Sequence, residues 1–242
     1  MSEKLQFSSI VERSLAVLGR NLTGVALVSV LLAGLPSMLL SAQLPMPGQQ
    51  PASLTGFVLF LFLLLTGQNL LAGMMLYPAF RHQLGLAPPA LGLLFSYGAQ
   101  LAFQAIATAL ALAAAVGLGM LLFVLPGLIF ALVFFVAMPA AIVERLPALE
   151  ALKRSVQLTE GHRWTILGYM VILWIVSLLI GWAAGLVFSI FGLAEVAAVI
   201  VSSLIYAFSA IVTSLVYHDL RRLKEGTTAE DMVRTLMQGA GN

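Results

Sequence analysis

Six long apolar segments limit what this chain can fold into more than any other feature of the sequence. They lie at about 22–43, 54–80, 92–120, 124–144, 163–187 and 194–218. Each has close to or more than the roughly 20 residues that a helix needs to cross about 30 Å of hydrocarbon. Only 9% of the residues are charged and 61% are hydrophobic, whereas soluble domains carry roughly 25% charged residues. The sequence therefore predicts an all-α integral membrane protein with six transmembrane helices.

The distribution of the 12 lysines and arginines predicts the topology. They flank the segments as follows: Lys4, Arg13, Arg20, Arg81, Arg145, Lys153, Arg154, Arg163, Arg221, Arg222, Lys224 and Arg234. If each of the six segments crosses the membrane once, all of these positions lie on the same side. Positively charged loops stay in the cytoplasm, so we expect both termini to be cytoplasmic. This expectation requires a hairpin turn within 119–125, because a continuous helix there would reverse the side of everything that follows.

The six segments are expected to pair as three hairpins, accompanied by amphipathic helices at the membrane interface. Residues 5–20 and 147–160 both carry apolar side chains on one face and charged side chains on the other, which is typical of surface helices. In the second of these, Glu150 and Arg154 are spaced for an i,i+4 ion pair. Residues 1–225 are expected to form a single membrane domain. The short cytoplasmic tail 226–242 contains Thr228 and Asp231, which resemble a helix-capping pair.

Glu144, at the cytoplasmic end of the fourth segment, is the most informative single charge. A carboxylate near the membrane interface needs water or a partner, and Arg81, Arg154 and Arg163 are expected at the same depth. One interpretation is a gate or a head-group contact. The other, which we favour, is an ion pair that fixes the 147–160 helix to the bundle. Lys153 and Arg154 on that helix either bind anionic lipid or form the solvated face of a plain connector.

A smaller set of polar residues lies within the apolar segments or at their outer ends: Gln68, Asn69, Gln100, Gln104 and Glu195. Amides at that depth usually form hydrogen bonds between helices, and this is the interpretation we prefer for the four amides. Glu195 begins the sixth segment, where the helix dipole favours a negative charge. The alternative is that these residues line a polar path through the membrane.

Residues typical of catalysis are missing from the sequence. It contains no cysteine, and His82, His162 and His218 lie too far apart along the chain for a local metal motif. Phosphate-binding glycine loops, HExxH and GxSxG motifs do not occur. The basic residues flank apolar segments and do not form a nucleic-acid-binding patch. We therefore expect neither an enzyme nor a cofactor or metal site.

The stretch PGLIFALVFFVAMPAAIVE, followed by ALKRSVQLTEGHRW and VYHDLRRLKEG, resembles a group of bacterial membrane proteins. These are the membrane domain of some glycerophosphoryl diester phosphodiesterases and the YciC-type inner-membrane proteins of unknown function. The matching positions are Pro126, Gly127, Pro139, Glu144, Ala151, Ser155, Leu158, Gly161, Trp164, Tyr217, Asp219 and Arg221. The resemblance implies a stand-alone membrane domain of the bacterial inner membrane, and it carries over no catalytic activity.

Two functions from different classes are compatible with these observations. The first is a non-catalytic inner-membrane protein of envelope or lipid homeostasis. It would contact lipid head groups, another membrane protein or a second copy of itself through Glu144, Lys153, Arg154, Arg163 and Arg221. The alternative is a permease or channel for a small or amphipathic solute, with its path lined by Gln68, Asn69, Gln100, Gln104 and Glu195.

Overall fold

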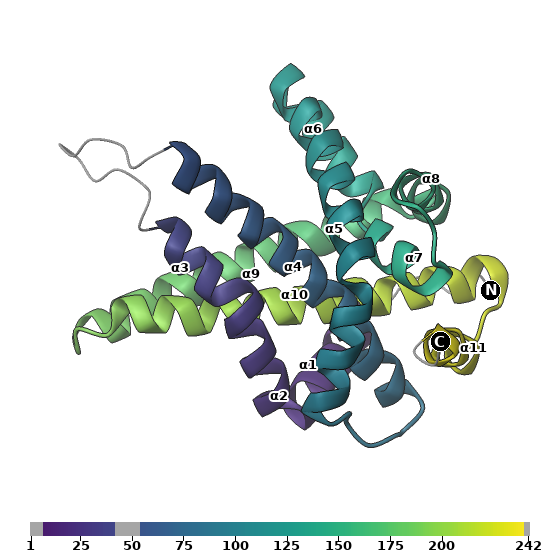
Figure 1. The fold of residues 1–242 in the computed structure, drawn as a ribbon, viewed down its shortest axis with the longest axis horizontal. Coiled ribbons are helices and arrows are strands. Elements are labelled where there is room, and N and C mark those ends of the chain that lie inside the picture. Colours follow the sequence, from purple (N-terminus) through teal and green to yellow (C-terminus); the bar gives the residue numbers. More distant parts are fainter. Residues whose placement is uncertain (1–6, 42–53, 240–242) are drawn as a thin grey trace.

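The chain folds as a bundle of helices in the computed structural model, which describes residues 7–41 and 54–239 (Figure 1). No strand occurs among these residues. The helices are α1 (Phe7–Arg20), α2 (Leu22–Ser29), the π-helical turn η1 (Val30–Gly34), α3 (Leu35–Ser41), α4 (Leu54–Gln83), α5 (Leu91–Leu122), α6 (Val124–Val133), α7 (Ala137–Glu144), α8 (Ala148–Thr159), α9 (Arg163–Ser189), α10 (Ala194–Glu225) and α11 (Ala229–Gly239).

The predicted all-helical class is confirmed, and six helical stretches among the described residues are long and apolar enough to cross a membrane. Four of them extend beyond the predicted ends, α4 and α10 the furthest. α4 runs to Gln83 and α10 to Glu225, because the charged residues there continue the helical pattern. Gly226, with a positive φ of 67°, ends α10, as glycine commonly does at helix C-termini. The predicted loop at 43–53 lies outside the described residues.

Consecutive spans pack together as the hairpin prediction requires: α3 against α4, α5 against α6, and α9 against α10. The tightest reversal is between α5 and α6, where Phe123 alone separates the helices in an extended conformation. A Cβ atom on Gly119 would lie only 2.9 Å from the Cα atom of Gly127. These two glycines let the helices lie side by side directly after the turn, so the chain does reverse within 119–125.

The first span bends through a π-helical turn, and Pro36 gives a physical reason for it. Proline has no N–H group, so the carbonyl of Leu32 loses the partner that an α-helix would supply four residues later. The register shifts instead, and the N–H of Leu35 donates to the carbonyl oxygen of Val30. Gly67 of α4 packs directly against the Leu32 carbonyl, where a side chain would overlap the oxygen. The bend and the glycine together bring the first two spans into close contact.

The fourth predicted segment, 124–144, is not one continuous helix but two, α6 and α7, separated by Phe134–Val136. Pro139 disfavours a continuous helix because its ring clashes with the carbonyl four residues earlier. α8 supplies the missing hydrogen bonds at the break. The Ser155 hydroxyl donates to the carbonyl oxygen of Val133 at 2.8 Å and accepts from the N–H of Val136 at 3.3 Å. The break therefore fixes α8 to the bundle.

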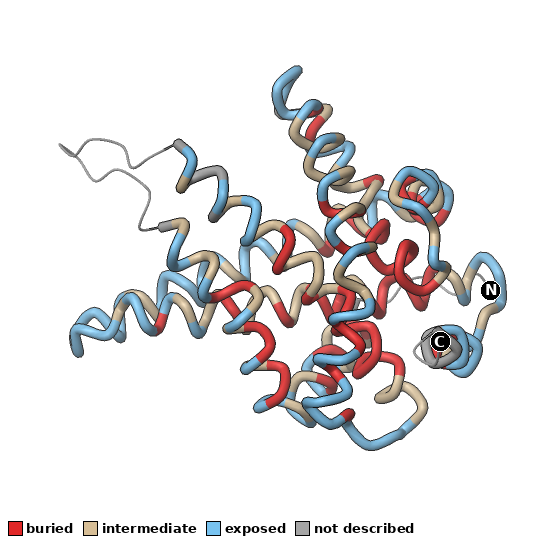
Figure 2. Tube along the Cα trace, in the orientation of Figure 1, coloured by how far each residue is buried: buried red, intermediate tan, exposed pale blue. Residues whose placement is uncertain are grey.

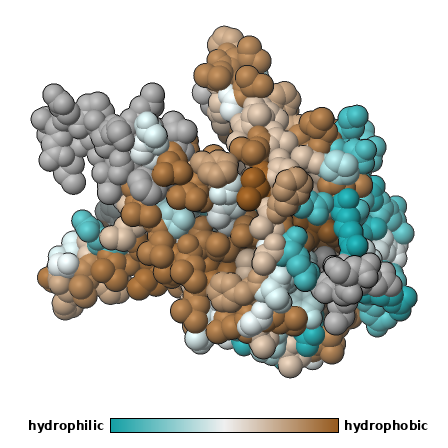
Figure 3. Space-filling model, viewed as in Figure 1, coloured by the Kyte–Doolittle hydropathy of each residue, from teal (hydrophilic) through white to brown (hydrophobic). Residues whose placement is uncertain are grey.

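The buried core is formed where α4, α7 and α10 meet, and α9 lies at its edge (Figure 2). The largest buried side chains include Phe80, Tyr169 and Tyr217. In contrast, no residue in the most apolar 18-residue stretch of α9 is buried. Space-filling colours show hydrophilic residues gathered at the end of the molecule where α8 and the last turns of α10 lie, while apolar side chains cover most of the remaining visible face (Figure 3). The surface is thus divided into an apolar body and a polar end.

Both segments predicted to form amphipathic helices are helical, as α1 and α8. Ile10 and Val17 bury one face of α1 against α10, while α8 buries Ala151, Leu152 and Leu158. The tail forms α11, and the predicted capping pair is confirmed. The Thr228 hydroxyl lies 2.6 Å from Asp231 Oδ2, and the Asp231 N–H donates to Thr228 Oγ1 at 3.3 Å. The hydrogen bonds from the side chain and backbone of Thr228 lower the pKa of Asp231.

Candidate functional site

Glu144 is the centre of a hydrogen-bonded charge network at the polar end of the bundle. As the last residue of α7, it faces α8 and the final turns of α10. Arg154 Nε donates to both of its carboxylate oxygens, at 2.7 and 3.0 Å. The Tyr217 hydroxyl donates to Glu144 Oε1 at 2.9 Å. Three helices are therefore connected through one carboxylate.

A second carboxylate, Glu225, completes the network. Arg154 Nη2 donates to Glu225 Oε1, and Arg221 Nε donates to Glu225 Oε2 at 2.9 Å. Arg221 Nε also lies 3.8 Å from Glu144 Oε1. We call these residues, Glu144, Arg154, Tyr217, Arg221 and Glu225, the Glu144 network. Burial by itself would lower the pKa of Arg154, but the hydrogen bonds and charges of Glu144 and Glu225 outweigh it and raise that pKa.

The network balances its own charge, since it contains two guanidinium groups and two carboxylates. Removing one of these charged residues would leave a partly buried charge without its partner. The free-energy cost of that unpaired charge exceeds the net stabilisation that an intact pair provides. The arrangement is suited to holding α7, α8 and α10 together. The predicted pinning of the 147–160 helix by Glu144 and Arg154 therefore matches the observed geometry.

Two sequence-based pairings differ from the structure. Arg154 pairs with Glu144 and Glu225 and not with Glu150, which is exposed one turn earlier on the same face of α8. Arg81 was expected near Glu144, but its Nε donates to the carbonyl oxygen of Ala87 at 3.0 Å, and its Nη1 to the Tyr77 hydroxyl at 3.2 Å. For Arg81 the reason is helix azimuth, since residues at one depth can still face in different directions. For Arg154 the reason is the position of α10, which supplies Glu225 as a partner.

Lys153 and Arg163 are the two members of the predicted contact set that remain exposed. Within residues 7–41 and 54–239, neither forms a salt bridge. Trp164, directly after Arg163, is 86% exposed. Tryptophan and cationic side chains favour the interface between membrane and water. Of the five predicted residues, these two are thus placed to meet something outside the chain.

A second buried charge cluster joins α1 to α10, and sequence reasoning missed it. Arg13 donates from Nη2 to Asp219 Oδ2 at 2.5 Å and from Nη1 to Asp219 Oδ1 at 3.2 Å. The ring Nδ1 of His218 lies 2.9 Å from Asp219 Oδ1. Arg13 and Asp219 are 206 positions apart, so no local spacing could have indicated the pair.

The residues predicted to line a polar path lie on α4, α5 and α10. Asn69 Nδ2 donates to the carbonyl oxygen of Leu65 in its own helix at 2.8 Å. Gln104 Nε2 donates to the carbonyl oxygens of Ala141 and Leu146, at 2.6 and 2.9 Å. Gln100 and Glu195 are exposed on different helices. The hydrogen bonds of Gln104 match the preferred interhelical role.

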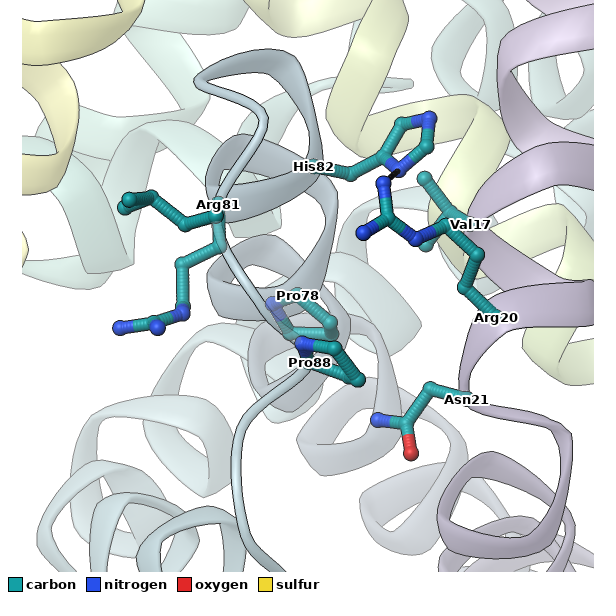
Figure 4. A pocket seen from close by; sticks show the side chains of 8 residues that line it. Val17, Arg20, Asn21, Pro78, Arg81, His82 and Pro88 are labelled. Atoms are coloured by element: carbon teal, nitrogen blue, oxygen red, sulfur yellow. Dashed lines mark hydrogen bonds between the residues drawn. The ribbon is translucent and has the colours of Figure 1, made fainter.

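A small pocket lies elsewhere, between the end of α1, the end of α4 and the following loop (Figure 4). Its lining consists of Val17, Arg20, Asn21, Pro78, Arg81, His82, Leu86 and Pro88. Arg20 Nη1 lies 3.4 Å from His82 Nδ1. None of the predicted contact or path residues contributes to it. In the part of the chain that the structure describes, no three His, Asp or Glu side chains are grouped to hold a metal ion.

These features define an all-helical protein with six membrane-length apolar helices and a charge network at one end. The sequence model of a family described as a domain of unknown function, DUF7847, matches residues 71–219. The match covers more than half of the chain, so the chain belongs to this family. It includes Glu144, Arg154 and Tyr217 but ends at Asp219, before Arg221 and Glu225. A search of curated proteins finds no match, and a search of solved structures finds none.

Proposed function

We propose that this chain is a non-catalytic protein of the bacterial cytoplasmic membrane that acts in envelope or lipid homeostasis. In this proposal it engages anionic lipid head groups, or a partner protein, through α8 and the start of α9 at its cytoplasmic rim. The resemblance of residues 125–226 to the phosphodiesterase membrane domains and YciC-type proteins supports the location, and a relationship of these groups to DUF7847 is part of the proposal.

One observation carries the proposal. The Glu144 network holds α8 at the polar end of the bundle, while Lys153 and Arg163 are exposed and form no salt bridge with the described residues. An exposed tryptophan beside Arg163 adds a side chain suited to a lipid interface. Arg154 and Arg221, which the sequence suggested as contact residues, have a structural role in this proposal. The hydrogen bonds of Asn69 and Gln104 to backbone carbonyls favour a structural role for these amides over a permease path.

Replacing Lys153 and Arg163 together with alanine is expected to remove a preference for anionic lipid. Each basic residue near an anionic surface contributes about 1 kcal/mol, so the two changes correspond to roughly a thirty-fold loss of selectivity. The protein would be reconstituted with Trp164 as its single tryptophan, after Trp174→Phe and Trp182→Phe. Fluorescence quenching by brominated phosphatidylglycerol and brominated phosphatidylcholine then reports which lipid lies beside Trp164.

Gln157→Ala is the matched control, because Gln157 is an exposed, uncharged residue of the same helix. It should leave the quenching ratio unchanged. Equal quenching by both lipids in the wild-type background would contradict lipid engagement at α8 and favour a protein partner.

The proposed orientation is tested by single cysteines, which the cysteine-free chain makes simple. Ser189→Cys lies beside the turn between α9 and α10, and Gln157→Cys lies on α8; both positions are exposed. In intact cells, an impermeant maleimide is expected to label position 189 and to label position 157 only after lysis. The reverse pattern would overturn the cytoplasmic placement of the termini and of α8.

A further inference from the structure

We propose that the pocket between α1, α4 and the 84–90 loop binds the phosphate group of an anionic phospholipid. This inference depends on the proposed function in one respect only: the pocket must lie close to the lipid head groups. It concerns a site distinct from the Glu144 network and from Lys153 and Arg163.

The charge and donors of the pocket fit an anionic oxygen. Arg20 brings a guanidinium group, and His82 adds an imidazole from the end of α4. Arg81 also lines the pocket, but its guanidinium is directed away from Arg20 and His82 (Figure 4). None of the described lining residues is an aspartate or glutamate, so these cations are not neutralised within the pocket. Arg20 donates through Nη1 towards His82, and Arg81 through Nε and Nη1. Because a guanidinium carries five N–H donors, Arg20 keeps further donors for a ligand.

Asn21 adds an observation that is independent of charge. Its Nδ2 atom is buried and has no hydrogen-bond partner among the described residues. In Figure 4 the amide nitrogen faces the side on which Pro88 lies, and both residues line the same pocket. Buried polar groups normally have a hydrogen-bond partner, and a phosphate oxygen would supply the missing acceptor.

The size and surroundings of the pocket favour a lipid phosphate over a free one. Its volume of about 10 Å³ admits roughly one water-sized group, so a single phosphate oxygen enters while the rest of the group meets exposed Arg20. Leu86 belongs to the lining and is exposed, as are neighbouring Leu22 and nearby Leu91. A phospholipid can place its acyl chains against these leucines, whereas inorganic phosphate gains nothing from them.

The test is native mass spectrometry of the full chain, released from a neutral detergent after titration with phosphatidylglycerol. Wild-type protein is expected to retain one molecule per chain. Arg20→Gln combined with Asn21→Asp should weaken retention at least ten-fold, since the change removes a cation and places a carboxylate in the pocket. Arg20→Gln alone alters an exposed side chain and should weaken it several-fold in protein that remains folded. Arg234→Gln, an exposed arginine of α11, is the matched control and should retain the lipid.

Competition with inorganic phosphate distinguishes a phospholipid from free phosphate as the ligand of the pocket. Excess inorganic phosphate should leave the lipid bound, and displacement by phosphate would overturn a lipid-specific site. Wild-type-like retention by folded Arg20→Gln and by the double variant would also overturn the proposal. Lys153→Ala with Arg163→Ala should keep this single bound lipid, so a failure of the proposed function at α8 is distinguishable from a failure of this site.

Discussion

Replacing Gly67 with alanine is expected to destabilise the protein, although alanine favours a helix over glycine by about 1 kcal/mol. A Cβ atom at this position would overlap the carbonyl oxygen of Leu32 and lie 3.0 Å from its carbon. The obstacle is backbone held in the π-helical turn, so it cannot rotate away as a side chain would. Overpacking of this kind costs about 1–3 kcal/mol. We expect the thermal midpoint in detergent to fall by roughly 5 °C.

Gly181→Ala provides the matched comparison for Gly67→Ala. Gly181 lies in α9, and a Cβ atom there would meet nothing within 4 Å. Its thermal midpoint should stay the same or rise slightly, as helix propensity alone predicts. If both variants shifted the midpoint equally, close approach of the first two spans at Gly67 would not explain the effect.

Replacing Asp219 with alanine is expected to release α1 from the bundle. Asp219 accepts two hydrogen bonds from Arg13, and its side chain is only 12% exposed. Its loss leaves the Arg13 guanidinium, itself 29% exposed, without its carboxylate. Breaking a buried pair from one side costs about 3–5 kcal/mol, and the partial exposure of Arg13 places the expected cost near the lower end, at about 3 kcal/mol. Hydrogen–deuterium exchange of residues 7–20 should accelerate.

Two further variants separate the Arg13–Asp219 pair from general charge effects. Asp231→Ala removes an exposed carboxylate that caps α11 and should leave exchange in α1 unchanged. Arg13→Met combined with Asp219→Leu should recover much of the lost stability, because an apolar pair of similar volume often replaces a buried ion pair at little cost. Slow exchange of α1 in Asp219→Ala would show that apolar contacts such as Ile10 and Val17 hold the helix without the ion pair.

The candidate site was only partly predictable from the sequence. Glu144 and Arg154 were identified because they are separated by 10 positions across a short connection, and an interfacial carboxylate needs a partner. Tyr217 and Glu225, which complete the network, lie far along the chain on α10. Arg154 was also paired with Glu150 on helical spacing alone. That spacing makes the pair sterically allowed, while the position of α10 makes Glu225 the partner.

The sequence by itself determined the helical class, the six apolar spans and the Thr228–Asp231 cap. Each of these features depends on composition or on residues a few positions apart, so the sequence predicts it without any knowledge of tertiary contacts. Tertiary structure decided the break before Pro139 and its repair by Ser155, the contact of Gly67 with Leu32, the Arg13–Asp219 pair and the pocket at Arg20. These features need helices from distant parts of the chain to face one another, and an apolar sequence allows many rotations of each helix. Packing between the helices selects the rotation of each helix at which the buried polar groups form hydrogen bonds with one another.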